Sequence, residues 1–450
     1  MRGTILLFFH WLYMLFLLLP ISALSQESES TALLDSQDLQ FLEELTSSVM
    51  ESSRIYPGQK AVEQFGPNNT GGTLIRPGGR NAYPSFWIRD YAMSLESGLV
   101  KMEEQKHMLL LTAATQCDQT WITQGGSMVP YGAIADHIRI DDGLPIFYPG
   151  TYSFEQQGIA MFGKTPPYSD QFFFIHMAWY YVAHTGDEDI LSREINGSSL
   201  LERLQTAFHM IPEGEKSLVY TTDDFRGVDF GFRDVQVITG HLCYPSILKY
   251  RAACQLANLL ERFGQSDKAL NYKNMAEMIQ KAIPKMFMDE GGMLRASTGK
   301  SSQRDVWATA LAIYLNAMND EYQEKACEAL TGAYLDGTLA YRGNIRHIQT
   351  TDDFSDETAW EISYADKNTY QNGSYWGTPT GWVSHAIAQV NIEAARELAK
   401  EYINDLRESD YRRGDDFGGP YECFHPKTGD LRNPVYLTTV SCPYAVFKKN

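Results

Sequence analysis

Residues 244–286 read YPSILKYRAACQLANLLERFGQSDKALNYKNMAEMIQKAIPKM, and this stretch decides the predicted fold. Apolar residues recur in it at intervals of three and four, which is the period of an amphipathic helix. The pattern predicts one helix over Tyr244–Phe263 and a second over Ser266–Met286, joined through the short connector Phe263-Gly264-Gln265. Two long helices joined by so short a turn form an antiparallel helical hairpin.

The same helical period recurs along most of the chain. It predicts further helices over Thr31–Ser53, Tyr91–Trp121 (broken once), Gln171–His184, Leu200–Met210, Asp305–Asn319, Tyr322–Tyr334, Gly381–Val390 and Ile392–Leu406, before a final helical run. Strand-like pieces are few and short, such as Ser217–Thr221 and Gly292–Leu294. The chain is therefore predicted to be all-α.

The connectors between these helices alternate in length. Five long ones, rich in Gly, Pro, Asp and aromatic residues, cover residues 54–90, 123–169, 212–243, 336–380 and 408–433. Long loops without helices of their own tend to be functional. Ten to twelve helices with short turns on one side and long loops on the other predict an (α/α)6 toroid, formed as a single domain by residues 26–450. The alternative is an irregular helical array or solenoid, but the chain shows no 34- or 40-residue repeat.

The N-terminus carries an export pattern. MRGTILLFFHWLYMLFLLLPISALSQ has one Arg, an apolar run and small residues before Ser25, which together predict a signal peptide over residues 1–25. An uncleaved membrane anchor is the alternative reading, since the run is at the short end of a membrane span. We expect a secreted or periplasmic protein with no other membrane contact.

Composition limits the partners. The net charge is −18, and no basic cluster of the kind that binds phosphate is present, so a nucleic-acid partner is not expected. An uncharged or cationic substrate fits better. Aromatic residues make up 12% of the chain, which suits both large cores and sugar-stacking clefts. We expect no metal and no cofactor, because metal motifs and Gly-rich phosphate loops are absent from the sequence, and we expect a monomer.

The six cysteines show neither CxxC spacing nor a dense pattern. This spacing argues against a zinc site and against a disulfide scaffold. At most one or two bridges are expected, and Cys423 with Cys442 is the candidate pair.

Two carboxyl groups in the long loops are candidates for acid–base chemistry. Glycoside cleavage needs one carboxylic acid to protonate the leaving oxygen and one carboxylate to activate water or attack the anomeric carbon. Asp234 lies in an aromatic, Gly-rich turn before a long helix, and Glu422 lies in a loop before the final helix. From the residues alone, Asp234 could equally cap the loop or pair with Arg233, and Glu422 could be solvated.

Four segments, in order, resemble the six-hairpin glycosidases. FWIRDYAMSL (86–95) is similar to the W-x-R-D segment of glucoamylases, and GFRDVQVITGHLCYPSILKYRAACQLA (231–257) resembles the segment with their general acid. YECFHPKTGDLRNPVYLTTVSCPYAVF (421–447) looks like the glucoamylase segment with the catalytic base. TYQNGSYWGTPTGWVSHAI (369–387) is similar to a segment of related sugar hydrolases and phosphorylases.

The resemblance implies a role for each matching residue. Trp87 would stack on the sugar ring, and Arg89 and Asp90, in a loop before a helix that begins at Tyr91, would hydrogen-bond its hydroxyl groups. Asp234 would be the general acid and Glu422 the general base of an inverting glycoside hydrolase that acts from the non-reducing end of an oligosaccharide or glycoside.

The sequence departs from the glucoamylase pattern at the acid. Glucoamylases have a Glu there, whereas trehalase-like relatives use an Asp, as this chain does at position 234. Asp229 is the reserve acid and Glu361 the reserve base.

Other residues of these segments have two readings. Asp170 lies at the start of a helix, where it could cap the helix or contact sugar. Trp376 could be a core residue or a stacking platform. Asp305 is predicted mainly to cap a helix.

Two further function classes stay open. A sugar isomerase or epimerase on the same toroid would move a proton with paired histidines, for which His241 and His425 are candidates. A non-catalytic carbohydrate-binding protein is the other alternative.

Overall fold

The computed structural model describes residues 32–80, 83–159, 163–227 and 231–449. The chain divides into two compact units, Met1–Ala32 and Leu33–Asn450, of which the second contains nearly all of the described residues. The predicted signal peptide, residues 1–25, lies outside the described residues. Among the described helices, none has both the length and the apolar character that a membrane span requires.

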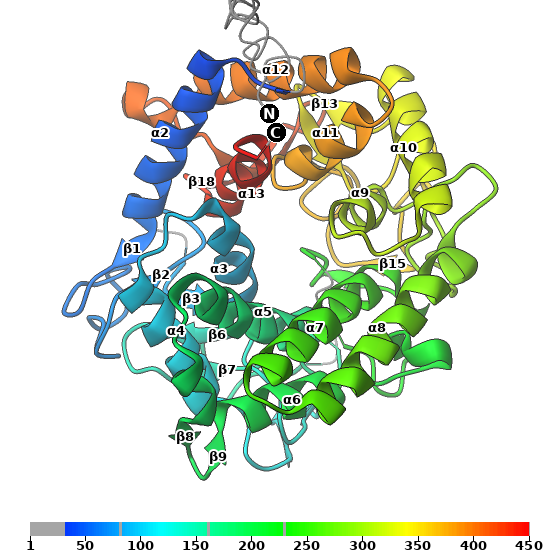
Figure 1. The fold of residues 1–450 in the computed structure, drawn as a ribbon. Coiled ribbons are helices and arrows are strands. Elements are labelled where there is room, and N and C mark those ends of the chain that lie inside the picture. Colours follow the sequence, from blue (N-terminus) through cyan, green and yellow to red (C-terminus); the bar gives the residue numbers. More distant parts are fainter. Residues whose placement is uncertain (1–31, 81–82, 160–162, 228–230, 450) are drawn as a thin grey trace, which may run out of the picture. The chain divides into compact units, whose positions relative to one another are not determined.

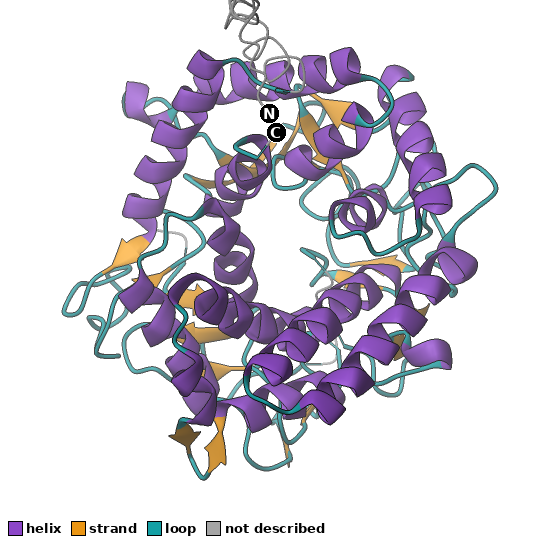
Figure 2. Cartoon of the chain, in the orientation of Figure 1, coloured by secondary structure: helices purple, strands orange, loops and turns teal. Residues whose placement is uncertain are grey.

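Helices dominate the unit that begins at Leu33, as the sequence predicts (Figure 2). Each predicted helix has a counterpart, and the long prediction at Tyr91–Trp121 is split into two. The described residues form α2 (Ser36–Ser53), α3 (Ile88–Ser94), α4 (Met102–Ala114), α5 (Tyr168–Thr185), α6 (Leu200–Met210), α7 (Cys243–Arg262), α8 (Ser266–Phe287), α9 (Val306–Tyr314), α10 (Asp320–Leu335), α11 (Thr380–Ala388), α12 (Ile392–Ser409) and α13 (Leu437–Phe447). Short 3-10 helices are η2 (Leu95–Ser97), η4 (Glu188–Ser192), η5 (Glu215–Ser217) and η6 (Tyr411–Arg413).

These helices form two concentric rings within the unit (Figure 1). The odd-numbered helices α3 to α13 form the inner ring, and the even-numbered helices α2 to α12 lie outside them. Each inner helix contacts the next, and α13 contacts α3, which closes the ring. The described residues therefore adopt the predicted (α/α)6 toroid.

Local sequence signals explain where the helices start and stop. The side chains of Asp35, Asn319 and Asn391 accept backbone N–H groups at the N-termini of α2, α10 and α12, as N-cap residues do. Gly264 ends the α7 side of the shortest hairpin with φ +75°, a left-handed conformation that favours glycine.

The inner helices all begin at the same face of the toroid. Inner helices are followed by short connectors such as residues 263–265 and 389–391, whereas long segments lead from each outer helix to the next inner one. Because inner and outer helices alternate in direction, the long loops and the N-termini of the inner helices gather at one end. The partial positive charge of a helix N-terminus favours carboxylates at that end.

Short strands in the segments between the helices pair into small antiparallel sheets. The sequence predicts few of them. The strand-like piece predicted at Ser217–Thr221 corresponds to Tyr220–Thr221, whereas Gly292–Leu294 forms no strand and contributes only Leu294 to an isolated bridge with Met288. The pairs are β1 (Arg54–Ile55) with β2 (Leu74–Ile75), β4 (Trp121–Ile122) with β5 (Met128–Val129), β8 (Glu194–Ile195) with β9 (Ser198–Ser199), β10 (Tyr220–Thr221) with β12 (Gly240–His241), and β11 (Gln236–Val237) with β15 (Ile362–Ser363).

Two larger sheets support the candidate site. The first joins β3 (Ser85–Trp87), β6 (His137–Arg139) and β7 (Pro145–Ile146). The second has the order β13 (Ala340–Tyr341), β14 (Asn344–Arg346), β16 (Tyr375–Trp376), β17 (Tyr421–His425) and β18 (Asp430–Pro434). Both connect segments that are far apart in sequence, a pairing that local patterns do not reveal.

The expected pairing of Cys423 with Cys442 is wrong, because all six cysteines are free. Cys423 lies in β17, whereas the Cys442 thiol on α13 faces the carbonyl oxygen of Met93 at 3.6 Å. Both thiols are buried.

A buried carboxylate joins the first and last outer helices. Asp38 of α2 is 3% exposed and accepts hydrogen bonds from Lys400 Nζ and Arg407 Nη1 of α12, each at 2.6 Å. The apolar face of α2 also packs against α13. Asp38 thus adds charged hydrogen bonds at the place where the ring closes on itself.

Replacing Asp38 with Ala should lower the free energy of unfolding by about 1–2 kcal/mol, because two charge-assisted hydrogen bonds are lost while both cations keep partial access to water. Chemical denaturation at pH 7 measures the change. Glu393→Ala on the same α12 is the control, since its pair with Arg396 is solvent-exposed and worth at most about 0.5 kcal/mol. Equal losses in the two variants would show that apolar packing alone closes the ring.

Candidate active site

Arg89 and Asp90 lie in the first turn of α3. The helix begins at Ile88 rather than at Tyr91, so the prediction that Trp87–Asp90 form a loop is wrong after Trp87. Both charged side chains are buried, with Arg89 Nη2 3.7 Å from Asp90 Oδ2. Tyr436 Oη donates to Asp90 Oδ1 at 2.6 Å. The pair therefore belongs to the end of an inner helix, where the toroid's long loops gather.

Two further carboxyl groups surround Arg89. Arg89 Nη1 is 3.9 Å from Asp136 Oδ1, and Asp170 lies in the first turn of α5, fully buried. Burial, followed by the charge of Asp136, raises the pKa of Asp170 well above its ordinary value. Burial alone would lower the pKa of Arg89, but the neighbouring carboxylates raise it instead. Arg89 is thus the cation around which these acids collect.

Asp170 does not act as a side-chain cap in this structure. The N-terminus of α5 shows no side-chain capping hydrogen bond, and neither Asp170 carboxyl oxygen has a hydrogen-bond partner among the described residues. Its capping reading is therefore not supported, while its predicted sugar contact stays a prediction.

Asp234 lies just before β11 and is partly buried. The side-chain amide of Gln371 donates to Asp234 Oδ1, while Gln371 Oε1 accepts from the backbone N–H of Val235 at 3.0 Å. Burial raises the pKa of Asp234, and the charge of Asp136 adds to this effect. Gln371 therefore fixes the carboxyl group of Asp234 against its own loop.

The neighbouring cation Arg233 has a separate anchor. Arg233 Nη2 donates to Asp305 Oδ1 at 2.8 Å, and the same oxygen accepts from the backbone N–H of Ala308 at 2.9 Å. Asp305 thus caps α9, as the sequence predicts, and also holds the loop that carries Asp234.

Glu422 lies in β17, not in the predicted loop, and is 1% exposed. Its Oε2 accepts hydrogen bonds from Tyr83 Oη at 3.1 Å and from the side-chain amide of Asn433. Burial raises its pKa to about 8, with contributions from the charges of Asp90 and Asp234. The solvated reading of Glu422 is therefore excluded.

The structure brings Arg89, Asp90, Asp170, Asp234 and Glu422 into one electrostatic cluster. The pKa of Asp90 is raised to about 6 by burial, against the opposing effect of Arg89. Carboxyl groups that raise one another's pKa do not all ionise at the same pH, and the pKa of Glu422, about 8, lies above that of Asp90. An acid and a base can therefore coexist here.

Trp87 precedes α3 and is 9% exposed. Its ring stacks on His137, with centroids 4.3 Å apart and an interplanar angle of 17°. His137 Nδ1 lies 2.7 Å from Asp136 Oδ2, and its Nε2 lies 3.0 Å from the carbonyl oxygen of Thr151. The tryptophan is thus fixed in orientation, and its predicted stacking on a sugar stays a prediction.

Trp376 is fully buried in β16. Its ring lies 5.3 Å from Phe232 and 5.8 Å from both Trp307 and Tyr370. Phe232 in turn lies under the Arg89 guanidinium, 4.8 Å from its ring centroid. Trp376 therefore packs behind the cation, and its predicted sugar contact has no support from these contacts.

The reserve residues differ in what can be said of them. Asp229, the reserve acid, lies outside the described residues. Glu361, the reserve base, accepts hydrogen bonds from the backbone N–H of Thr239 at 3.0 Å and from its hydroxyl group at 2.9 Å. Glu361 thus has a local anchoring role.

The two histidines of the isomerase alternative have separate surroundings. His241 Nε2 accepts from the backbone N–H of Glu215 at 3.1 Å, whereas His425 stacks on Tyr375 with centroids 5.7 Å apart. Among the described residues, no hydrogen bond or ring contact joins the two. The geometry therefore does not favour a histidine pair.

Sequence reasoning missed six residues that complete the cluster. Asp136 and His137 lie in the stretch ADHIRI (135–140), directly after the buried residues 132–135. The sequence of one protein gives no sign that they are neighbours of Arg89. The others supply hydrogen bonds across the site: Tyr83, Gln371, Asn433 and Tyr436.

No protein-family model matches the chain, and no curated protein matches its sequence. Solved structures do match in fold. A rhamnosidase from Klebsiella oxytoca with rhamnose bound aligns with TM-score 0.57 and 10% identity over 93% of this chain. Glucoamylase from Saccharomycopsis fibuligera aligns with TM-score 0.56 and 12% identity over 93% of this chain and 96% of its own. The chain has the fold of the six-hairpin glycosidases.

A third structure supports the same fold. The GH63 mannosylglycerate hydrolase from Thermus thermophilus, in complex with glucose, aligns with TM-score 0.54 and 11% identity, over 91% of this chain and all of its own. This chain spans 65% of the Klebsiella rhamnosidase and 34% of a GH78 rhamnosidase from Bacillus sp. GL1. The six-hairpin toroid is thus shared with proteins of very different length.

Replacing Glu422 with Gln should stabilise the protein increasingly between pH 4.5 and 8. The folded wild type keeps its proton up to about pH 8, whereas the unfolded chain ionises near 4.5. The stability that this carboxyl group contributes is therefore present below pH 4.5 and lost as the pH rises to 8. Glutamine does not titrate, so the variant should gain up to a few kcal/mol in free energy of unfolding by pH 8.

Asp405→Asn on α12 is the control for this pH series. Burial raises the pKa of Asp405 to about 6, so any gain there should level off near pH 6. Denaturation curves at half-unit steps measure both variants. A difference between Glu422→Gln and wild type that does not change with pH would contradict the raised pKa.

Proposed function

We propose that the protein is a glycoside hydrolase that cleaves a glycosidic bond at the non-reducing end of its substrate. One observation carries this proposal: two carboxyl groups with raised pKa, Asp234 and Glu422, lie in one electrostatic cluster with the Arg89–Asp90 pair. The cluster occupies the end of a toroid whose structural neighbours include a rhamnosidase, a glucoamylase and a mannosylglycerate hydrolase.

The two carboxyl groups divide the roles of acid and base. Asp234 is partly exposed, which lets its proton reach the leaving oxygen, and we assign it as general acid. Glu422 accepts two hydrogen bonds through Oε2, which stabilise its charged form, and we assign it as general base. When Asp234 holds the proton, its charge no longer opposes ionisation of Glu422, so the productive state has one proton on the pair.

Inversion is the stereochemical outcome we propose. In inverting enzymes the base activates a water on the face of the sugar opposite the acid. Glu422 lies on the sheet strand β17, and Asp234 lies on the loop before β11, so the two approach from different elements. A water held by Glu422 would then attack as Asp234 protonates the leaving oxygen.

Arg89 and Asp90 are proposed to bind sugar hydroxyl groups. A guanidinium offers several donors in a fixed plane, and a carboxylate accepts, so together they suit adjacent hydroxyl groups of a pyranose. Trp87 would stack on the ring and Asp170 would add an acceptor. Rhamnose and glucose, which the neighbouring structures hold, are therefore suitable probe sugars.

We further propose that the protein acts on its carbohydrate substrate as an exported monomer. The apolar N-terminal segment and the small residues before Ser25 support export. A carbohydrate-binding protein without activity would share the sugar contacts, and turnover separates it from a hydrolase.

Asp234→Asn and Glu422→Gln should each lower kcat by about a hundredfold to ten thousandfold, the usual loss when a general acid or base is removed. Nitrophenyl and alkyl glycosides of rhamnose and glucose measure the effect. Asp234→Asn should lose less activity on the nitrophenyl glycosides, whose leaving group needs little protonation. Glu361→Gln, altered at an anchoring residue, is the matched control and should retain activity.

The product anomer gives an independent measurement. Proton NMR of fresh product should show inverted configuration at the anomeric carbon. Retention would contradict the assignment of Glu422 as base. Wild-type protein that binds sugars without turnover, unaffected by either substitution, would favour the binding-protein alternative.

The pH profile of kcat/KM should rise with pH toward about 8. A base acts in its ionised form, and the pKa of Glu422 in the free protein is about 8. Asp90→Asn removes a charge that raises this pKa, so its rising limb should move about half a pH unit or more toward lower pH. Profiles of wild type, Asp90→Asn and Glu361→Gln test this. A profile that falls through pH 8 would instead make Glu422 the proton donor.

A further inference from the structure

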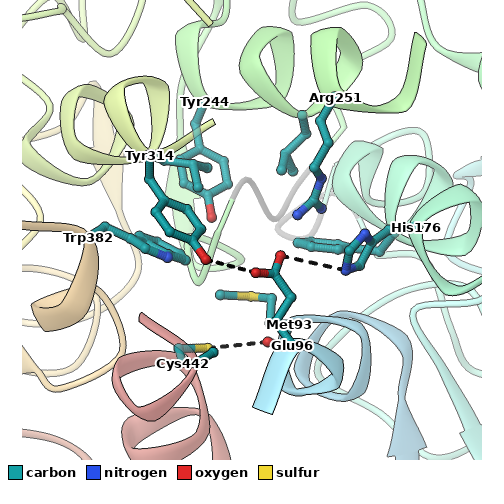
Figure 3. A pocket seen from close by; sticks show the side chains of 12 residues that line it. Met93, Glu96, His176, Tyr244, Arg251, Tyr314, Trp382 and Cys442 are labelled. Carbon is teal, nitrogen blue, oxygen red and sulfur yellow. Dashed lines mark hydrogen bonds and ion pairs between the residues drawn. The ribbon is translucent and has the colours of Figure 1, made fainter. Parts of the chain in front are cut away.

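A second group of polar side chains faces a small cavity among the inner helices. The cavity has a volume of about 20 Å³ and is lined in part by Glu96, His176, Tyr244, Arg251 and Tyr314. Figure 3 shows the Glu96 carboxylate at its centre, with the Arg251 guanidinium, the His176 ring and the Tyr314 hydroxyl group directed toward it. The proposed hydrolysis uses none of these residues.

Within the described part of the chain, hydrogen bonds reach one of the two carboxylate oxygens of Glu96. Oε2 accepts from Tyr314 Oη at 2.8 Å and from Lys449 Nζ at 3.0 Å. Oε1 faces His176 Nε2 at 4.0 Å, which is too long for a hydrogen bond. Burial would raise the pKa of Glu96, but His176, Lys449 and Arg251 lower it to about 2. Glu96 is therefore charged, with one acceptor oxygen directed at the cavity.

His176 presents a donor to the same space. Its Nδ1 is 2.8 Å from Gln255 Nε2, which donates to it, so the proton of the neutral ring is on Nε2. Burial lowers the pKa of His176 to about 3, and the charge of Arg251 adds to this. The Nε2–H group is buried and has no hydrogen-bond partner among the described residues.

Arg251 and Tyr244 add further donors. Arg251 lies over the Phe173 ring at 5.2 Å, but its Nε and Nη2 have no hydrogen-bond partner among the described residues. The same holds for the hydroxyl group of Tyr244, which is 1% exposed. Buried donors without hydrogen-bond partners are unfavourable, so a molecule that accepts these hydrogen bonds would be strongly favoured.

We propose that the cavity binds one ordered water molecule that bridges Glu96 and Arg251. One water needs about 10–15 Å³ of such space and two to four polar partners, and the cavity provides both. The water accepts hydrogen bonds from Arg251 and His176 and donates one to Glu96 Oε1. The Tyr244 hydroxyl group is a further partner in the same cavity. A small anion would also accept from the donors, but the Glu96 carboxylate opposes it.

The bridge ties several inner helices together below the candidate active site. Glu96 lies in η2, directly after α3, while His176 and Arg251 belong to α5 and α7. Glu96 follows Asp90 by six positions, a rise of about 9 Å along the helix. Glu96 is therefore a positioning residue that holds the far end of the helix carrying Arg89 and Asp90, an effect on sugar binding that rests on the proposed function.

A crystal structure and a double-mutant cycle test the water bridge. We expect a water peak within hydrogen-bond distance of Glu96 Oε1 and Arg251 in the wild type. Glu96→Gln and Arg251→Met should each lower the folding equilibrium constant about tenfold or more. The double variant should lose about tenfold less than the product of the two losses, since both remove the same bridge.

Lys449→Met is the matched control, because it removes a half-exposed partner of Glu96 that lies on Oε2. Combined with Arg251→Met, its effect should simply multiply. Absence of the water peak, or multiplicative losses for Glu96→Gln with Arg251→Met, would overturn the bridge. An anomalous peak at this site in bromide-soaked crystals would show that the cavity binds an anion instead of water.

The positioning role has its own measurement. Glu96→Gln should raise KM about fivefold while kcat stays within about twofold, and Lys449→Met should change neither. If Glu96→Gln leaves KM unchanged while its coupling with Arg251→Met is observed, the water bridge is supported and the positioning role is contradicted. If the wild-type protein is inactive, both the proposed function and the positioning role are contradicted. The electron density at the site and the coupling between Glu96→Gln and Arg251→Met would still test the water bridge.

Discussion

A buried guanidinium among carboxyl groups is the interaction on which the candidate site depends. Arg89 faces Asp90, Asp136, Asp170 and Asp234, and their charges raise its pKa despite its burial. Burying one charge costs several kcal/mol unless it is paired, and here the number of acids exceeds the number of cations that face them. Burial, with a smaller contribution from neighbouring acids, raises the pKa of Asp90, Asp170, Asp234 and Glu422. Carboxyl groups with raised pKa are suited to donating and accepting protons in general acid–base catalysis.

The toroid determines where this cluster forms. Because all inner helices begin at one end, their N-termini bring Arg89, Asp90 and Asp170 together from α3 and α5, and the long loops and sheets bring Asp234 and Glu422 to them. The partial positive charge of helix N-termini offsets part of the acid charge. Contacts between consecutive inner helices, and between α13 and α3, close the ring.

Local sequence patterns predicted the helices well and the site only in part. Helical periodicity and short connectors such as Gly264-Gln265 are local signals, so the toroid followed from them. Arg89, Asp90, Asp234 and Glu422 could be proposed because each belongs to a segment that resembles known glycosidases. Asp136 and Gln371 could not, because their roles come from contacts between residues far apart in sequence. The strand around Glu422 was missed although β17 pairs with the nearby strand β18 in a hairpin; only its other pairing, with β16, is long-range.

Polar side chains of the inner helices lie at two levels of the toroid. Glu96 follows Asp90 by six positions on α3 and η2, and His176 follows Asp170 by six positions on α5. Six residues rise about 9 Å along a helix, so the two members of each pair lie at different levels of the toroid. The inner helices α3 and α5, with η2, therefore carry polar residues at two levels. The upper level gathers acids at the helix N-termini, where chemistry is possible. At the lower level the charge of Glu96 faces the two cations Arg251 and Lys449, which lower its pKa.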